Sequence, residues 1–350
     1  MNLALFLPNW VGDVVMATPT LRALRRHFGR PARIVGILRP ALAELLAGTD
    51  WLDETWCFDP HGKHFQWGRM ALVARMRRER FDMAVLLTHS LHTALLAWLG
   101  GAKERIGYVR HGRGPLLTGK LYPQRDGRRI RPASMVDAYL GLARAIGCPP
   151  ESPRLELVAT ESEQAQAERV WRALDLRTDG RVIALNSTGA YGAAKVWPAE
   201  HCGTLAREIV RQLDHDVLVL CGPAERQAAR DVVGYASSSR VVSLADQPVS
   251  LSLTKALLAR SRLLVSTDSG PRHMAAALDR PVVTLLGPTS PVWIENPTVR
   301  GSTVRAEIDC LGCGRRTCPL GHHHCMRNLA PDRVLAAVAQ QLDQHAAKAA

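Results

Sequence analysis

Short apolar, β-branched runs alternate with longer amphipathic segments along the chain, a pattern typical of parallel sheets covered by helices. In the first half, these runs predict strands at residues 3–7, 33–38, 55–58 and 83–87. Apolar residues at helical spacing predict helices over residues 18–28 and 40–47. The predicted fold class is therefore doubly wound α/β.

A second series of the same kind begins after a proline-rich stretch at residues 148–153, which has the composition of an inter-domain linker. It predicts strands near residues 182–186, 217–221, 241–243, 263–266 and 282–286. We therefore predict an N-terminal domain over residues 1–152 and a C-terminal domain over residues 153–330. The last helical pattern begins at residue 331, and we expect residues 331–350 to pack back on the N-terminal domain.

Composition narrows the class of protein. The chain of 350 residues is 47% hydrophobic and 22% charged, which is close to the globular average. No stretch approaches the roughly 18 uncharged apolar residues that a membrane span needs. The N-terminus has neither a basic leader nor a small-residue cleavage site, so we expect a cytoplasmic protein.

The formal net charge of +13 favours anionic partners. Basic residues concentrate between residues 103 and 131, where acidic neighbours are few. Such a run is either a solvated face or a surface for a phosphorylated substrate, an acidic membrane or nucleic acid. No nucleic-acid motif accompanies it, and aromatic residues are 5% of the chain, which leaves few platforms for stacked bases. We therefore expect no nucleic-acid partner.

A polar turn follows the first predicted strand, at residues 8–19. In open α/β sheets, ligands bind at the carboxyl ends of the strands, so Asp13 in this turn is placed to act as a general base. An aspartate at the start of a helix also accepts backbone N–H bonds, and Asp13 as a helix cap remains an alternative.

The turn at residues 186–198 also follows an apolar strand directly. Its small residues, Ser187 and Thr188 among them, would let backbone amides approach phosphate oxygens, and Lys195 supplies a positive charge. The spacing is not that of a P-loop, because no Gly-Lys-Ser or Gly-Lys-Thr occurs. An ordinary surface loop with an exposed lysine is the alternative.

A third turn, at residues 265–278, leads from a strand through Asp268, Ser269 and Gly270 into a helix of small residues. Amides at the start of that helix would bind a diphosphate, and hydroxyl groups add donors. His273 lies in the first turn and is predicted to hold a ribose or phosphate oxygen. The alternative is an aspartate that caps the helix and a histidine that packs in the core.

Four cysteines fall within sixteen residues near the C-terminus, and three histidines lie among them. We call the cysteines the four-cysteine cluster, which comprises Cys310, Cys313, Cys318 and Cys325. A Cys-x-x-Cys start indicates a structural zinc site, although the later gaps of four and six residues are less usual. Free thiols and, in the cytoplasm less readily, disulfides are the alternatives.

The three turns together resemble glycosyltransferase family 9, over essentially the whole chain. The matching residues are Trp10-Val11-Gly12-Asp13, the segment 192–198, Asp268-Ser269-Gly270 with His273, and the segment 287–291. The resemblance implies a GT-B fold, in which two Rossmann-like domains face each other across a cleft. It also implies transfer with inversion that requires no metal or other cofactor, and an ADP-heptose donor held by the C-terminal domain.

The resemblance assigns roles to individual residues. Asp13 matches the catalytic base, and Lys195 matches a lysine that contacts the donor phosphates. The residues that match the donor-binding turn are Asp268, Ser269, Gly270 and His273, and Glu225 matches more loosely an acidic residue near the donor ribose. Residues 193–198 read Ala-Ala-Lys-Val-Trp-Pro, so a basic residue that the family has beside Lys195 is missing.

The implied acceptor is an anionic inner-core lipopolysaccharide precursor at the inner face of the cytoplasmic membrane, which suits the basic N-terminal half. The candidate acceptor contacts are Arg110, Arg113 and Lys120. Two alternatives remain: another GT-B nucleotide-sugar enzyme with a different donor, such as an epimerase, and a non-catalytic basic protein that binds nucleic acid.

Overall fold

The computed structural model describes residues 1–60, 62, 64–127, 129–189 and 192–347. The chain folds into two compact units: unit 1 comprises residues 1–157 and 292–297, and unit 2 comprises residues 158–291 and 298–350. The division after residue 157 lies close to the predicted boundary after residue 152. The short return of the chain to unit 1 at residues 292–297 had no signal in the sequence.

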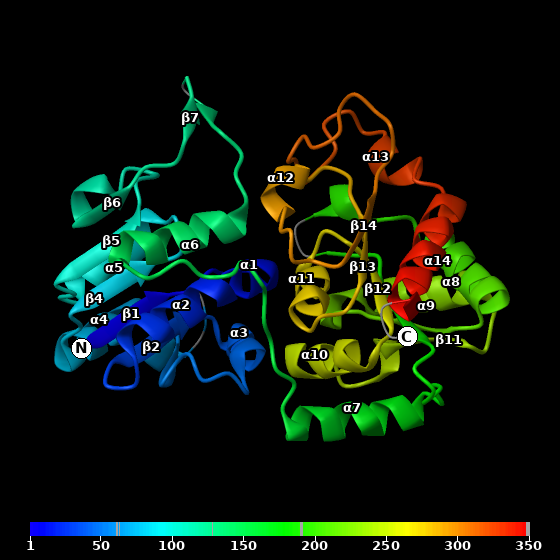
Figure 1. The fold of residues 1–350 in the computed structure, drawn as a ribbon, viewed down its shortest axis with the longest axis horizontal. Coiled ribbons are helices and arrows are strands. Elements are labelled where there is room, and N and C mark those ends of the chain that lie inside the picture. Colours follow the sequence, from blue (N-terminus) through cyan, green and yellow to red (C-terminus); the bar gives the residue numbers. More distant parts are fainter. Residues whose placement is uncertain (61, 63, 128, 190–191, 348–350) are drawn as a thin grey trace. The chain divides into compact units, whose positions relative to one another are not determined.

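Unit 1 is built on a parallel sheet with the strand order β3-β2-β1-β4-β5-β6 (Figure 1). The strands are β1 Asn2–Phe6, β2 Arg33–Leu38, β3 Glu54–Cys57, β4 Met83–Leu86, β5 Glu104–Tyr108 and β6 Gly119–Leu121. This 3-2-1-4-5-6 order is that of the Rossmann fold. A short antiparallel hairpin, β7 Arg125–Asp126 and β8 Arg129–Ile130, follows the sheet in the chain.

The helices of unit 1 cover this sheet because each presents an apolar side to it. They are α1 Val11–Met16, α2 Thr18–Phe28, α3 Pro40–Ala43, α4 Arg69–Glu79, α5 Leu91–Leu99 and α6 Met135–Ile146. One core cluster joins strand residues such as Phe6 and Ile37 to Met76 on α4 and Leu96 on α5. The predicted helix over residues 40–47 forms as α3 followed by a 3-10 turn, Glu44–Leu46.

Residues 292–297 form a strap that completes unit 1 from a distant part of the sequence. The strap overlaps the short helix α12, Pro291–Ile294. The carbonyl of Glu295 accepts a hydrogen bond from Ser134 Oγ at 3.0 Å, and Asn296 Nδ2 donates to the carbonyl of Pro153 at 2.8 Å. One bond attaches the strap to the start of α6, and the other attaches it to the segment that follows α6.

Unit 2 repeats the same topology, with the strand order β11-β10-β9-β12-β13-β14 and all neighbours parallel. Its strands are β9 Val182–Asn186, β10 Asp216–Val219, β11 Val241–Ser243, β12 Leu263–Thr267, β13 Val282–Leu285 and β14 Gly301–Val304. The prediction of two doubly wound, Rossmann-like domains is therefore confirmed. All of β9, β10, β12 and β13 are buried, as a sheet covered on both faces requires.

The helices of unit 2 are α7 Glu161–Ala173, α8 Ala199–Leu213, α9 Arg226–Ala236, α10 Leu251–Arg260, α11 Gly270–Ala277, α13 His324–Arg327 and α14 Pro331–Ala347. The last helix, α14, packs on α8, β13 and β14 and belongs to unit 2. Its residues Val334 and Val338 are buried. Contact of this helix with the N-terminal domain stays a prediction.

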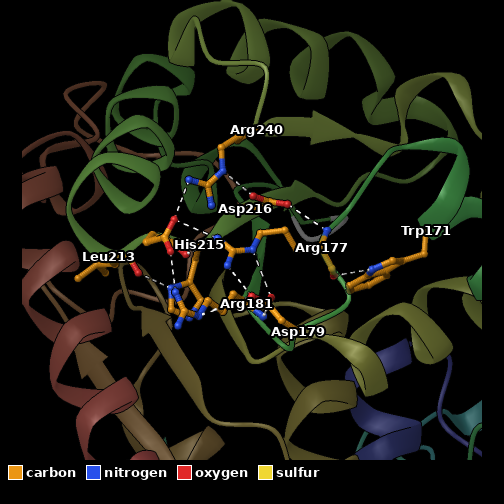
Figure 2. A network of polar contacts seen from close by, with 9 residues as sticks. Trp171, Arg177, Asp179, Arg181, Leu213, His215, Asp216 and Arg240 are labelled. Carbon is orange, nitrogen blue, oxygen red and sulfur yellow. Dashed lines mark hydrogen bonds and ion pairs between the residues drawn. The ribbon is translucent and has the colours of Figure 1, made fainter.

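An Asp-x-Asp sequence, Asp214-His215-Asp216, resembles metal-binding motifs of some sugar transferases. Both of its carboxylates form ion pairs with arginines instead (Figure 2). Asp214 ends α8 in a left-handed conformation, and its carboxylate pairs with Arg177, Arg181 and Arg240. Hydrogen bonds from Arg177 and Arg240 lower the pKa of Asp214 to about 2. Asp216 accepts from Arg240 at 2.7 Å. The two acids therefore tie the turn between α8 and β10 to the arginines that precede β9 and β11.

No helix among the described residues is both long enough and apolar enough to cross a membrane.

Candidate functional site

The carboxyl edge of the unit 2 sheet brings together two of the predicted turns. Asn186, the last residue of β9, donates through Nδ2 to Ser269 Oγ and to the carbonyl of Thr188, both at 2.9 Å. The hydroxyl of Thr267, the last residue of β12, donates to the same Thr188 carbonyl at 3.0 Å. Because β9 and β12 are neighbours, these bonds lock the two turns against each other.

Lys195 and Asp268 form an ion pair at the centre of this edge. The Lys195 Nζ atom lies 2.6 Å from Asp268 Oδ2 and 3.0 Å from the Asp268 carbonyl. Thr289, in the turn after β13, donates to the same Oδ2 at 2.8 Å. Both side chains are nearly buried, at 12% and 9% exposure, so solvent screens the pair little. The lysine predicted in one turn is therefore held by the aspartate predicted in the other.

Asp268 is ionised in this setting. Burial would raise its pKa, but the contact with His273 and the positive charge of Lys195 outweigh burial and hold the pKa far below the usual range. His273 Nε2 lies 3.5 Å from Asp268 Oδ1, and its ring is buried. Burial also lowers the pKa of His273. His273 is thus a partner of Asp268 inside the core, and its contact with a ribose or phosphate oxygen stays a prediction.

The start of α11 is available for an anion because its cap residue is otherwise engaged. Ser269 is the N-cap, but among the described residues its hydroxyl bonds Asn186 and Ser266 and donates to the Thr267 carbonyl instead of capping the helix amides. Asp268 lies before the cap and faces Lys195, so it is not the helix cap either. Gly270 opens the helix, where backbone amides and the dipole favour negative charge.

The other predicted donor residues occupy three different environments. Ser187 is buried and bonds the Cys202 thiol of α8, so its hydroxyl points into the core. The Thr188 hydroxyl is buried and has no hydrogen-bond partner among the described residues. Glu225 lies in a 3-10 turn after β10, at the same edge of the sheet, and its Oε2 accepts from the Gly222 amide at 2.8 Å.

The loop that carries the four-cysteine cluster packs on the donor-side turns. The Arg316 carbonyl accepts from the Ala194 amide at 3.1 Å, and the Gly312 amide donates to the Gly287 carbonyl at 3.2 Å. At Gly192, whose φ is +153°, a Cβ atom would lie 2.5 Å from the Arg316 oxygen, so a side chain there would separate the two segments. The cysteine loop therefore supports the position of Lys195.

The thiols of the four-cysteine cluster are all free. Burial raises the pKa of Cys325, and the charges of the other three raise it further, so the four sulfur atoms share one region. Backbone amides, His323 first among them, donate to Cys318 and lower its pKa. Within the described ranges, no three His, Cys, Asp or Glu side chains are arranged to hold a metal ion. Zinc binding by the four-cysteine cluster stays a prediction.

Asp13 lies at the carboxyl edge of the unit 1 sheet, as the third residue of α1. The helix cap is Trp10, whose side chain makes no capping bond, so the alternative of Asp13 as an N-cap does not describe its position. Tyr139, on α6, donates its hydroxyl to Asp13 Oδ1 at 3.4 Å. Burial and the nearby Asp13 charge raise the pKa of Tyr139 well above its usual value, so the phenol remains a hydrogen-bond donor.

The three basic residues predicted to contact an acceptor do not share one environment. Lys120, on β6, is exposed and Arg110 is half-buried. Arg113 is fully buried, and its guanidinium donates from Nε to the Tyr108 carbonyl at 2.8 Å and from Nη1 to the Thr88 carbonyl at 2.6 Å. Arg113 therefore lies inside unit 1, where two backbone carbonyls hold its guanidinium, and acceptor binding by the three residues stays a prediction.

Sequence reasoning missed Asn186 and Thr289, which hold the donor-side turns and Asp268 in place. A polar amide directly after four apolar strand residues was a usable signal for Asn186. Thr289 stood inside a recognised segment without a stated role. Neither residue could be paired with its partner without knowing that β9, β12 and β13 bring their ends to one edge.

The chain thus has two Rossmann-like units, with a carboxylate at the carboxyl edge of one sheet and a lysine beside a helix start at that edge of the other. Residues 69–324 match glycosyltransferase family 9 (heptosyltransferase), and the chain belongs to this family. The predicted class, a glycosyltransferase, is thereby confirmed.

Individual members of this family are similar to this chain over nearly its full length. The lipopolysaccharide heptosyltransferase 2 of Salmonella typhimurium is 25% identical over 343 residues, which are 96% of this chain and 97% of the relative. The structure of the Escherichia coli ADP-heptose lipopolysaccharide heptosyltransferase II is similar with a TM-score of 0.79, at 24% identity and 99% coverage of both chains. The E. coli heptosyltransferase WaaC, solved with ADP-2-deoxy-2-fluoro heptose, gives a TM-score of 0.68 at 18% identity, covering 99% of this chain and 100% of that one.

Proposed function

We propose that this chain transfers heptose from ADP-heptose to an anionic inner-core lipopolysaccharide acceptor. A relative that matches nearly the whole chain is named a lipopolysaccharide heptosyltransferase, and the name of a similar solved structure includes ADP-heptose. The observation that carries the proposal is the Lys195–Asp268 pair beside the uncapped start of α11, because it offers a fixed positive charge next to backbone amides. A nucleoside diphosphate is the ligand that needs both.

The proposed reaction is a single displacement with inversion. Asp13 takes the proton of an acceptor hydroxyl while that oxygen forms a bond to the anomeric carbon. The bond from the anomeric carbon to the β-phosphate oxygen breaks, and its electron pair leaves with ADP. Lys195 and the α11 amides stabilise the charge that develops on the diphosphate. Tyr139 holds the Asp13 carboxylate in one orientation through its hydroxyl.

We assign Asp268 to a positioning role on the donor side. It orients the Lys195 ammonium group through two oxygen atoms, and Thr289 and His273 keep its carboxylate in place. The turn thereby presents the positive charge without reorganisation when the donor binds, which is the condition under which electrostatic stabilisation is most effective.

We also propose peripheral contact with the inner face of the cytoplasmic membrane, through unit 1. Leu91, Leu95 and Trp98 lie on one side of α5 at helical spacing and are 47%, 37% and 51% exposed. α5 packs on α4, whose exposed arginines include Arg69 and Arg77. Apolar side chains beside arginines suit an anionic lipid surface. Flotation with anionic vesicles should fall for a Leu91→Ser/Trp98→Ser variant, and equal flotation with zwitterionic vesicles would contradict the assignment.

The transfer itself is tested by mass spectrometry with ADP-heptose and truncated core acceptors. The expected product gains one heptose unit, and NMR of its anomeric signal reports inversion. Calorimetry with ADP and with UDP separates this function from that of another nucleotide-sugar enzyme, because only ADP should bind tightly. Tight binding of UDP, or of nucleic acid at physiological salt, would replace the proposal with one of the alternatives.

A further inference from the structure

Unit 1 contains a buried group of cationic and imidazole side chains at the carboxyl ends of β4 and β5. His89 follows β4, and Arg110 and Arg113 follow β5. These strands continue the sheet from β1, whose own carboxyl end leads to Asp13, in the order β1-β4-β5 (Figure 1). Neighbouring strands are about 4.8 Å apart, so the group lies about 10 Å along the sheet edge from the turn with Asp13. We call it the β4–β5 cationic group.

Several polar atoms of the β4–β5 cationic group are buried without a protein partner in the described part of the chain. They are Nδ1 of His89, Nε of Arg110 and Nη2 of Arg113. The remaining bonds of Arg113, to the carbonyls of Tyr108 and Thr88, fix its guanidinium so that Nη2 is presented from a rigid base. Buried donors that lack an acceptor are costly, and they are rare in folded proteins unless a ligand or water meets them.

The group has an excess of positive charge. Burial and the charges of Arg110, Arg113 and His111 lower the pKa of His89 to about 4, and every one of these charges is cationic. Burial and Arg110 together lower the pKa of Arg113 to about 10. Other buried arginines of unit 1 have acidic partners: Arg22 pairs with Glu151 and Arg25 with Asp53.

Strand β5 has a glycine where the Arg113 guanidinium packs against it. A Cβ atom on Gly107, in β5, would lie 2.9 Å from Arg113 Nη2. The His89 ring packs edge-on against Tyr108, with 5.9 Å between the ring centroids. The Tyr108 hydroxyl is turned away and donates to the Ala138 carbonyl at 2.9 Å. The Tyr108 ring therefore packs beside the group and does not neutralise its positive charge.

We infer that His89, Arg110 and Arg113 form a binding site for an oxyanion of the acceptor, a carboxylate or a phosphate. An oxyanion accepts hydrogen bonds from both guanidinium groups and supplies the negative charge that the protein leaves out. Held there, it fixes the acceptor so that a hydroxyl reaches Asp13 in α1, the helix that follows β1 at the same edge of the sheet. The inference rests on the proposed function for the identity of the acceptor, and it adds His89 to the predicted contacts.

The test compares Arg110→Gln and His89→Gln with Lys103→Gln, which replaces an exposed lysine of the same basic region. Arg113 also supports the fold through two carbonyl bonds, so the variants at Arg110 and His89 carry the test. We expect Arg110→Gln to raise the acceptor KM about tenfold or more while ADP affinity and the donor KM stay unchanged. Lys103→Gln should change none of them. An acceptor KM in Arg110→Gln no higher than in Lys103→Gln overturns the site.

Modified acceptors identify the oxyanion. If the Arg110→Gln defect disappears with a dephosphorylated acceptor, the site holds a phosphate, and if it disappears with a carboxyl-reduced acceptor, the site holds a carboxylate. A binding measurement is independent of turnover: inorganic phosphate should raise the NMR pKa of His89, and the shift should vanish in Arg110→Gln. A chain that shows this shift but transfers no heptose would refute the proposed function and keep the site. An unchanged His89 signal with phosphate and with the acceptor refutes the site.

Discussion

Replacing Lys195 by methionine should separate its part in stability from its part in donor binding. The substitution leaves the Asp268 carboxylate, 9% exposed, without the cation that lies 2.6 Å away. Removing one partner of a buried pair costs about 3–5 kcal/mol. Thr289 and His273 still contact the carboxylate, so we expect a loss at the lower end, about 3 kcal/mol. At about 2–4 °C per kcal/mol, the melting temperature of unit 2 should fall by about 6–12 °C.

The double variant Lys195→Met/Asp268→Asn makes the reasoning specific. Without the buried charge, stability should return to within about 1 kcal/mol of the native chain. ADP affinity should not return, because the cation that faces the diphosphate is absent in both variants. Loss of charge-assisted hydrogen bonds is worth about 2 kcal/mol here, or about 30-fold in Kd for ADP. Adenosine, which lacks the diphosphate, should bind all three proteins alike.

Differential scanning calorimetry and isothermal titration calorimetry measure the two effects. The matched control is Lys103→Met, which breaks a 2.8 Å pair with Asp82 whose side chains are 73% and 35% exposed. An exposed pair should contribute less than about 1 kcal/mol. If Lys195→Met is no less stable than Lys103→Met, or if the double variant regains ADP affinity, the assigned role of the pair is refuted.

The other predictions concern Asp13, the charge of Asp268 and the four-cysteine cluster. Asp13→Asn should reduce turnover by about 10² or more with ADP affinity unchanged, and an equal loss of both in steady-state kinetics and calorimetry would make Asp13 structural. Because the folded-state pKa of Asp268 is lowered, its stabilisation is complete above about pH 4 and is lost as the pH falls further; urea midpoints should show this acid dependence in the native chain and less of it in Asp268→Asn. A zinc-bound cluster predicts about one zinc per chain by elemental analysis of untagged protein and a lower melting temperature with chelator, whereas zinc-free protein with four alkylated thiols excludes it.

Most of the fold could be predicted because local periodicity and global topology agree in it. The helix over residues 18–28 and the strand over residues 182–186 form with the predicted bounds, as α2 and β9. The short strands of the β7–β8 hairpin were missed, and so were three strands of the two large sheets, β5, β6 and β14. Each contains charged residues or glycine and has exposed positions, so it lacks the continuous apolar run by which buried strands are found.

The candidate site was predictable as a set of turns but not as a set of contacts. Asp13, Lys195 and Asp268 each follow a strand of the parallel sheets, and that rule needs only the sequence. The pairing of Lys195 with Asp268 depends on residues 73 positions apart, and the burial of Arg113 depends on carbonyls of two other segments. A run of basic residues shows its net charge in the sequence, but not which member the fold encloses.

The strap at residues 292–297 limits how this enzyme can be divided or recombined. Because it bonds Ser134 and Pro153, an expressed fragment that stops at residue 157 would lack part of its own unit and expose that surface. A chimera with a relative, made by exchanging the N-terminal half at one junction, would carry a strap from the wrong parent. Exchange of acceptor specificity between family members therefore calls for three junctions, near residues 157, 291 and 297, so that the strap travels with the half it completes.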